Sequence, residues 1–323
     1  MAQQHREPLL TVADASAGEA LARYLHQQAT EFLRGLRLHA DGGEAAGAAG
    51  LLRSAARRIA GALEVYRPLT DTGWADALRD ELAWAAEALG REYVCEARLA
   101  RLRGALHRLF GAPAAGVPGT PGVGAARAGA LLERQLTLAR NRAHSTALQA
   151  LGSARFHALA DAVALLSADP PLAPSTRPDD LTALAARTHR LLLDAVGALP
   201  LSVAGLPYNA EALAHGPDAD GRQDVPWHRV RSLLRLRRYA QEVLDEQHRA
   251  EVEPALSVRL LTAGQALDRH RDAAGAAAAA AAAARTPRIA PATAYALGVL
   301  HADQRHEVEA ARFAFGRIWQ RAS

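Results

Sequence analysis

Apolar residues recur every three or four positions along most of this chain, and this spacing favours helices over strands. In residues 71–90, Trp74, Leu78, Leu82 and Leu89 fall on one stripe of a helix, and the aspartate that opens the segment can cap its first turn. The apolar residues are mainly alanine and leucine, with few aromatic and few β-branched side chains, a mixture with high helix propensity. We therefore predict an all-α fold.

Proline- and glycine-rich stretches divide the predicted helices. Besides residues 71–90, helical spacing is found in residues 15–38, 52–66, 124–151, 153–168, 180–198, 227–240, 253–285 and 292–321. The breaks fall at residues 111–124, 168–180 and 199–226. A chain of 323 residues suffices for one large domain or two ordinary ones. We predict a single domain over residues 1–323, with a first half at 10–168 and a second half at 169–323.

A weak internal repeat supports this division. When residues 52–66 are shifted by 178 positions, they align with residues 230–244, and five of the fifteen pairs are identical. The identical pairs are Arg53 with Arg231, Ser54 with Ser232, Arg57 with Arg235, Glu64 with Glu242, and Val65 with Val243. The repeat predicts that two basic helices occupy equivalent places in the two halves.

The second of these helices carries unusual positive charge. Residues 227–240 read WHRVRSLLRLRRYA, with five arginines between positions 229 and 238 and no carboxylate among them. His228, Arg231, Arg235 and Arg238 share one stripe, because they are spaced at i, i+3, i+7 and i+10. Like charges one turn apart cost only about 0.2–0.5 kcal/mol per pair, so a solvated surface would tolerate this pattern. If both basic stripes face one cleft, however, they focus a positive potential that attracts an anion.

All 38 basic residues are arginines, and this limits the chemistry. Guanidinium groups stay charged and match phosphate oxygens with a planar fork, and the net charge of +4 also favours an anionic partner. Without lysine the chain has no Walker A motif and no Schiff-base nucleophile. The single cysteine, Cys95, excludes an internal disulfide or a CxxC metal site. His301 and Asp303 point about 200° apart on a helix, so they are not expected to share a metal ion. The sequence also lacks GxSxG and HExxH motifs, and we predict no metal ligands, no cofactor and no enzymatic activity.

Membrane association is not expected from the sequence. The N-terminus lacks the apolar core of a signal peptide, and the chain contains no uncharged apolar run of 18 residues. We therefore expect a cytoplasmic protein without a membrane partner.

At the basic helices the sequence resembles the CHAD family. The segment WHRVRSLLRLRRYA resembles the family motif L-H-x-x-R-K-x-x-K-R-x-R-Y, with His228, Arg231, Arg235, Arg238 and Tyr239 in the matching positions. The later segment LDRHRD, with His270 and Asp272, resembles the motif L-G-E-H-Q-D. The first-half motif V-H-x-x-R-V-x-x-R-R-L-R-S is reduced to GLLRSAARRIAG, which keeps Arg53, Arg57 and Arg58.

This copy departs from the family in its first half. Gly50 stands in place of a histidine and Ala60 in place of an arginine. A family R-D pair is replaced by Tyr93 and Val94. These departures predict weaker binding at the first-half basic helix.

The resemblance implies a fold and a ligand. It implies two four-helix bundles related by a pseudo-twofold, with a basic cavity between them, binding of inorganic polyphosphate and association with polyphosphate granules. The ligand would contact Arg53, Arg57, Arg58, His228, Arg231, Arg235, Arg238, Tyr239 and His270. Seven such contacts would give a salt dependence with a slope of roughly −5, and protonation of the two histidines, with reference pKa values near 6.5, would favour binding at pH 6 over pH 8.

Three other interpretations stay open. Nucleic acid is the less favoured anion, because few aromatic residues accompany the basic segments. A metal-dependent phosphohydrolase acting on polyphosphate or triphosphate would need carboxylates beside the basic cleft, where Asp272 is the obvious one. The first-half departures are also consistent with a helical interaction protein whose anion site has decayed.

Overall fold

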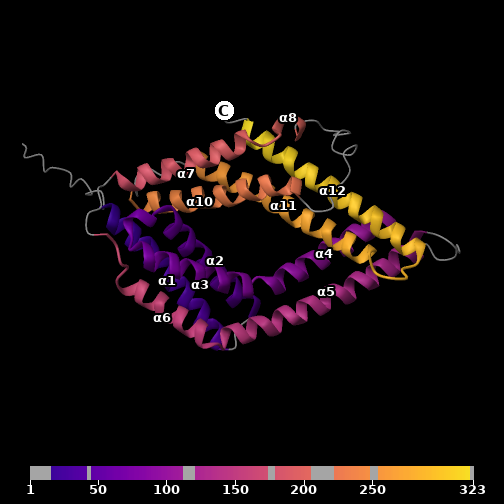
Figure 1. The fold of residues 1–323 in the computed structure, drawn as a ribbon, viewed down its shortest axis with the longest axis horizontal. Helices are drawn as coiled ribbons and strands as arrows, with labels where there is room; N and C mark the ends of the chain where they lie inside the picture. The colour runs from indigo at the N-terminus through magenta and orange to yellow at the C-terminus, as the bar shows by residue number, and fades with distance from the viewer. Residues whose placement is uncertain are drawn as a thin grey trace, which may run out of the picture.

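Helices make up almost all of the described structure, a computed structural model that covers residues 16–41, 45–111, 121–173, 179–204, 222–247 and 254–320 (Figure 1). The helices are α1 (Ala17–Ala40), α2 (Ala45–Val65), α3 (Thr72–Ala88), α4 (Arg91–Phe110), α5 (Pro121–Leu151), α6 (Ala154–Ala168), α7 (Asp180–Gly197), α8 (Leu201–Ala204), α10 (Val225–Gln247), α11 (Pro254–Ala284) and α12 (Pro291–Gln320). Short 3₁₀ turns, η1 (Arg67–Leu69) and η2 (Arg222–Asp224), precede α3 and α10. The predicted all-α fold is confirmed.

Capping side chains define two of the helix starts. The Asp71 carboxylate accepts a hydrogen bond of 2.9 Å from the Trp74 backbone N–H at the start of α3, as the sequence predicts. Ser16 and Glu19 form a reciprocal capping box at the start of α1. Helix α4 lies outside the predicted segments. Its buried residues are confined to its second half, so the apolar spacing that marks the other helices is weak over its first turns.

The largest apolar core joins helices from both predicted halves. It contains Phe32, Ile59 and Leu63 of α1 and α2 together with Ala240 and Val243 of α10. The buried Tyr66 hydroxyl donates a hydrogen bond of 3.0 Å to the Ala240 carbonyl. Helices α2 and α10 therefore pack directly against each other, as Figure 1 shows.

A second core lies where α4 and α5 meet α11 and α12, at the far end of the molecule in Figure 1. Ala276, Ala280 and Ala283 of α11 are fully buried there, and their small side chains let the helices approach closely. A third core, around Trp227, Phe315 and Trp319, joins α7, α10, α11 and α12. Helix α11 thus runs from the third core to the second.

The predicted domain division stays a prediction, as does the pseudo-twofold. Helix α6 ends at Ala168 and α7 begins at Asp180, which agrees with the predicted break at 168–180. The second core, however, takes two helices from each predicted half. Residues 1–15 and most of the breaks 111–124 and 199–226 lie outside the described residues. No helix in the described ranges has both the length and the apolar character that crossing a membrane requires.

Candidate anion-binding site

The two basic helices bring their arginines together. Apolar residues of α2 and α10 are buried in the cores, which leaves Arg53, Arg57, Arg231 and Arg235 half-buried. Burial lowers the pKa of Arg57, and the charges of Arg53, Arg231 and Arg271 lower it further. Burial likewise lowers the pKa of Arg235, with added effects from Arg57 and Arg271. We call these five residues, Arg53, Arg57, Arg231, Arg235 and Arg271, the arginine cluster.

Two members of the arginine cluster are already paired with acids. Arg231 donates from Nε to the Asp268 carboxylate at 2.6 Å. Arg271 binds the neighbouring Asp272 at 2.9 Å. The Arg53 guanidinium lies 4.8 Å from the centre of the Tyr93 ring, an exposed residue that the family motif does not contain.

Arg57 and Arg235 are different. Within the described residues, neither has a hydrogen bond or an ion pair with a carboxylate. Both line a cavity of about 380 Å³ between α2, α3 and α10, together with Tyr239. The acids that also line it, Glu64 and Asp80, are separate from them, and Glu64 is ion-paired with Arg79. The cavity therefore offers two guanidinium groups that have no hydrogen bond or ion pair with a carboxylate among the described residues, one from each repeat of the predicted pair.

Tyr239 closes this cavity on the side of α2. Its ring is 6% exposed and lies against Gly61, where an added Cβ would fall 2.3 Å from the tyrosine Cδ2 atom. The absence of a side chain at Gly61 is therefore what lets Tyr239 occupy its place beside Arg57 and Arg235.

Two of the predicted arginines lie outside the arginine cluster. Arg58 donates from Nε to Glu242 at 3.1 Å, and Arg238 approaches the same carboxylate at 3.5 Å. The Tyr24 hydroxyl also donates to Glu242, at 2.7 Å, and burial together with this carboxylate raises the pKa of Tyr24. The sequence analysis predicts Arg58 and Arg238 on the binding face, and in the structure the two arginines share one carboxylate, that of Glu242.

The two predicted histidines are stacked beside the cluster. His270 is 1% exposed and lies parallel to the Trp227 ring, with a centroid distance of 5.7 Å. His228 is half-buried and meets His270 edge-on at 5.5 Å. Burial lowers the pKa of both histidines. Burial therefore favours the neutral form of both imidazole rings in the free protein.

A buried ion network that sequence reasoning missed holds these histidines. Asp224 accepts hydrogen bonds from Arg305 at 2.9 Å and from Arg312 at 2.7 Å, and its carboxylate lies 3.3 Å from the His270 ring. Burial alone would raise the pKa of Asp224, but the hydrogen bonds of His270 and Arg305 lower it well below its usual range. This burial favours a positioning role for His270 over direct contact with a ligand.

No local sequence signal marks the network, because 88 residues separate Asp224 from Arg312. Arg271, the fifth member of the cluster, did have a signal, since it follows directly after His270 in the recognised LDRHRD segment.

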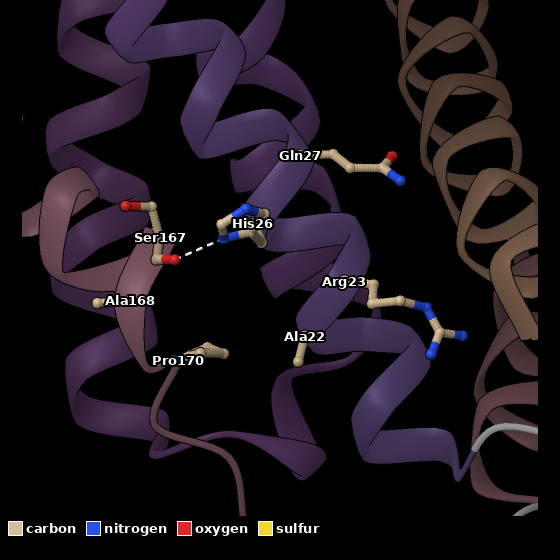
Figure 2. Close-up of a pocket in the computed structure, with 7 residues that line it drawn as sticks. All are labelled: Ala22, Arg23, His26, Gln27, Ser167, Ala168 and Pro170. Atoms are coloured by element: carbon tan, nitrogen blue, oxygen red, sulfur yellow. Dashed lines mark hydrogen bonds between the residues drawn. The ribbon is translucent and has the colours of Figure 1, made fainter.

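A separate cavity of about 330 Å³ lies between α1 and the end of α6 (Figure 2). His26 binds the Ser167 carbonyl at 2.5 Å there, and the only arginine in its lining, Arg23, donates to the Glu246 carbonyl at 2.9 Å. This cavity lacks a concentration of positive charge. Among the described residues, no group of three or more His, Cys, Asp or Glu side chains is placed to hold a metal ion.

Comparisons with known proteins agree with the geometry. A family model described as the CHAD domain matches residues 23–281. The solved structure of PptA from Streptomyces chartreusis is 55% identical to this chain, covers 95% of it and 100% of its own chain, and superposes with a TM-score of 0.80. The crystal structure of the CHAD domain from the plant Ricinus communis is 22% identical, covers 97% of this chain and 96% of its own, and has a TM-score of 0.63, which shows a shared fold. No curated protein matches the chain.

Proposed function

Because the chain belongs to the CHAD family, we propose that it binds inorganic polyphosphate in the cavity between α2 and α10 and does not hydrolyse it. The observation that carries the proposal is the position of Arg57 and Arg235. They come from the two repeated segments, line the same cavity, and have no carboxylate partner within the described residues. A phosphate chain supplies the negative charge that these half-buried guanidinium groups lack.

Polyphosphate suits this site better than nucleic acid does. It presents only charged oxygens, whereas single-stranded nucleic acid gains much of its affinity from bases stacked on aromatic rings. Tyr239, the aromatic residue in the cavity lining with Arg57 and Arg235, is only 6% exposed and so offers little surface for a stacked base.

Two carboxylates beside the arginine cluster are engaged in ion pairs, which favours binding over metal-assisted hydrolysis. Asp268 and Asp272 are each bound by an arginine of the cluster. A carboxylate in an ion pair would have to release its arginine before it could ligate Mg²⁺. We therefore keep hydrolysis as the alternative that the assay below tests.

The test is a calorimetric titration with long-chain polyphosphate, single-stranded DNA and RNA at several salt concentrations. We expect polyphosphate to bind most tightly, with an affinity that falls steeply as salt rises. The variant Arg231→Ala/Arg235→Ala should lose this binding, whereas Arg134→Ala, an exposed residue of α5 outside the cavities, should keep it. Equal affinity in the wild type and the double variant would place the site elsewhere, and phosphate release in the presence of Mg²⁺ would favour the hydrolase.

Granule association is part of the same proposal and follows from the family resemblance. We expect a fluorescent fusion of the protein to coincide with polyphosphate-stained granules in cells. The Arg231→Ala/Arg235→Ala variant should be diffuse. Granule localisation of both forms would mean that another surface directs it.

A further inference from the structure

A second basic cavity adjoins the arginine cluster. It has a volume of about 540 Å³ and lies between α3, α4 and α5. Arg57 lines both cavities. The two cavities therefore share a guanidinium group that already belongs to the proposed binding site.

Four arginines line this second cavity, and most of their charge is not neutralised. They are Arg57, Arg91, Arg98 and Arg142. Its single acidic lining residue, Glu87, is bound by Arg91 at 2.5 Å. Within the described residues, Arg98 and Arg142 have no hydrogen bond or ion pair with a carboxylate. Four arginines and one acid give this cavity an excess of three positive charges. Like the first cavity, it therefore has a positive potential that attracts an anion.

The position of Arg98 links the cavity to α11. Its Nη2 atom lies 2.9 Å from the place that a Cβ on Gly275 would occupy, so this side chain crosses from α4 to α11. Gly275 is one helical turn after Arg271 and lies on the same face of α11. Arg98 consequently extends the row of guanidinium groups from the arginine cluster towards α4 and α5.

We propose that this cavity is a second phosphate-binding compartment, in which Arg98 and Arg142 hold the part of a polyphosphate chain that continues beyond the arginine cluster. The inference rests on the proposed function. A short polyphosphate would occupy the arginine cluster, where five guanidinium groups meet. A long chain would reach both compartments, and the protein would thus select for chain length.

The experiment compares tripolyphosphate with long-chain polyphosphate by calorimetric titration of the full chain. For Arg98→Ala/Arg142→Ala we expect the affinity for the long chain to fall at least about tenfold, because two charge-assisted contacts are lost. The salt slope for the long chain should become shallower by about 1.4. The affinity for tripolyphosphate should change less than twofold. Arg134→Ala, from the same helix as Arg142, is the matched control and should change neither.

A single exposed substitution protects the test from folding defects. Arg142 is exposed, so the Arg142→Glu variant should fold normally. Its affinity for the long chain should fall more than that of Arg142→Ala, because glutamate repels the anion. Equal losses for both chain lengths, or no loss for the long chain, would overturn the second compartment. In that case loss of binding by Arg231→Ala/Arg235→Ala would leave the proposed function standing. Failure of the wild type to bind either polyphosphate would overturn both.

Discussion

The double substitution Arg57→Ala/Arg235→Ala separates a binding role from a structural one, because the two roles predict opposite effects. Both side chains are half-buried, and both line the cavity between α2 and α10. The positive charges of nearby arginines lower the pKa of each of them. Groups that repel one another in the folded protein do not stabilise it. Their removal should therefore harm binding and spare the fold.

The magnitude follows from the site. A hydrogen bond from a charged group contributes about 1.5–3 kcal/mol, and partial exposure favours the lower value. Loss of two such contacts amounts to about 3 kcal/mol, or roughly a 100-fold weaker affinity for polyphosphate at low salt. If all five arginines of the cluster contact phosphate, the slope of log affinity against log salt is about −3.5, and the double variant reduces it to about −2.1.

The unfolding free energy should move the other way. Alanine has the highest helix propensity, and the substitution removes like-charge repulsion between α2 and α10. We expect the melting temperature of the double variant to equal or exceed that of the wild type. Calorimetric titration and thermal unfolding measured on the same samples test both halves of the prediction. A melting temperature several degrees lower, or an unchanged affinity, would refute the reasoning.

Three other predictions concern the residues around the cluster. Asp224→Asn should lower the unfolding free energy by about 3 kcal/mol, because it removes the carboxylate that faces two buried arginines. Since the folded-state pKa of Asp224 is depressed, this difference should be full above about pH 4 and shrink as the pH falls further, as chemical denaturation across pH would show. Polyphosphate affinity should stay flat from pH 8 to pH 7 and rise below about pH 6.5, because His228 takes up a proton beside the bound anion. The His228→Gln variant should not show this rise. A wild-type affinity that stays flat down to pH 5 would contradict the prediction. Gly61→Ala should lower the unfolding free energy of the wild type by about 1–3 kcal/mol, because the added methyl group clashes with Tyr239. In a Tyr239→Ala background the same substitution should be neutral or should raise the unfolding free energy by up to about 1 kcal/mol. Equal losses of unfolding free energy in the two backgrounds would disprove the contact.

Local patterns predicted most of the fold. Helix α3 begins at the expected aspartate cap, and the break between α6 and α7 falls at the expected residues. These features depend on residues close in the chain, so a sequence carries them directly. Helix α4 escaped prediction because its burial comes from α5 and α11 over only part of its length.

The sequence indicates which helices carry the arginines of the candidate site, but not which of these arginines form ion pairs. The internal repeat pairs Arg53 and Arg57 with Arg231 and Arg235, and all four belong to the cluster. The same face also carries Arg238, but Arg238 forms an ion pair with Glu242, one turn further along its own helix. Spacing on a helix shows which side chains point the same way, but not which of them finds an acid.

Long-range contacts explain the remaining differences. Asp224, Arg305 and Arg312 meet only because α12 returns to the start of α10. Arg98 and Arg142 lie outside the quoted family motifs and enter the basic region because α4 and α5 pack beside α3 and α11. Such pairs are set by the tertiary fold, and one sequence contains no periodic pattern that reports them.

The arrangement of paired and unpaired arginines suggests how the protein keeps a repulsive site open. Apolar contacts and the Tyr66 to Ala240 hydrogen bond hold α2 and α10 together beneath the cluster, so the helices cannot separate to relieve the charge. Asp268 fixes Arg231, and Glu242 fixes Arg58 and Arg238, at the edges of the site. Arg57 and Arg235 are left half-buried without such partners among the described residues. A polyanion entering between them would meet cations that are already positioned and partly buried. Binding would therefore require little free energy to reorganise these side chains.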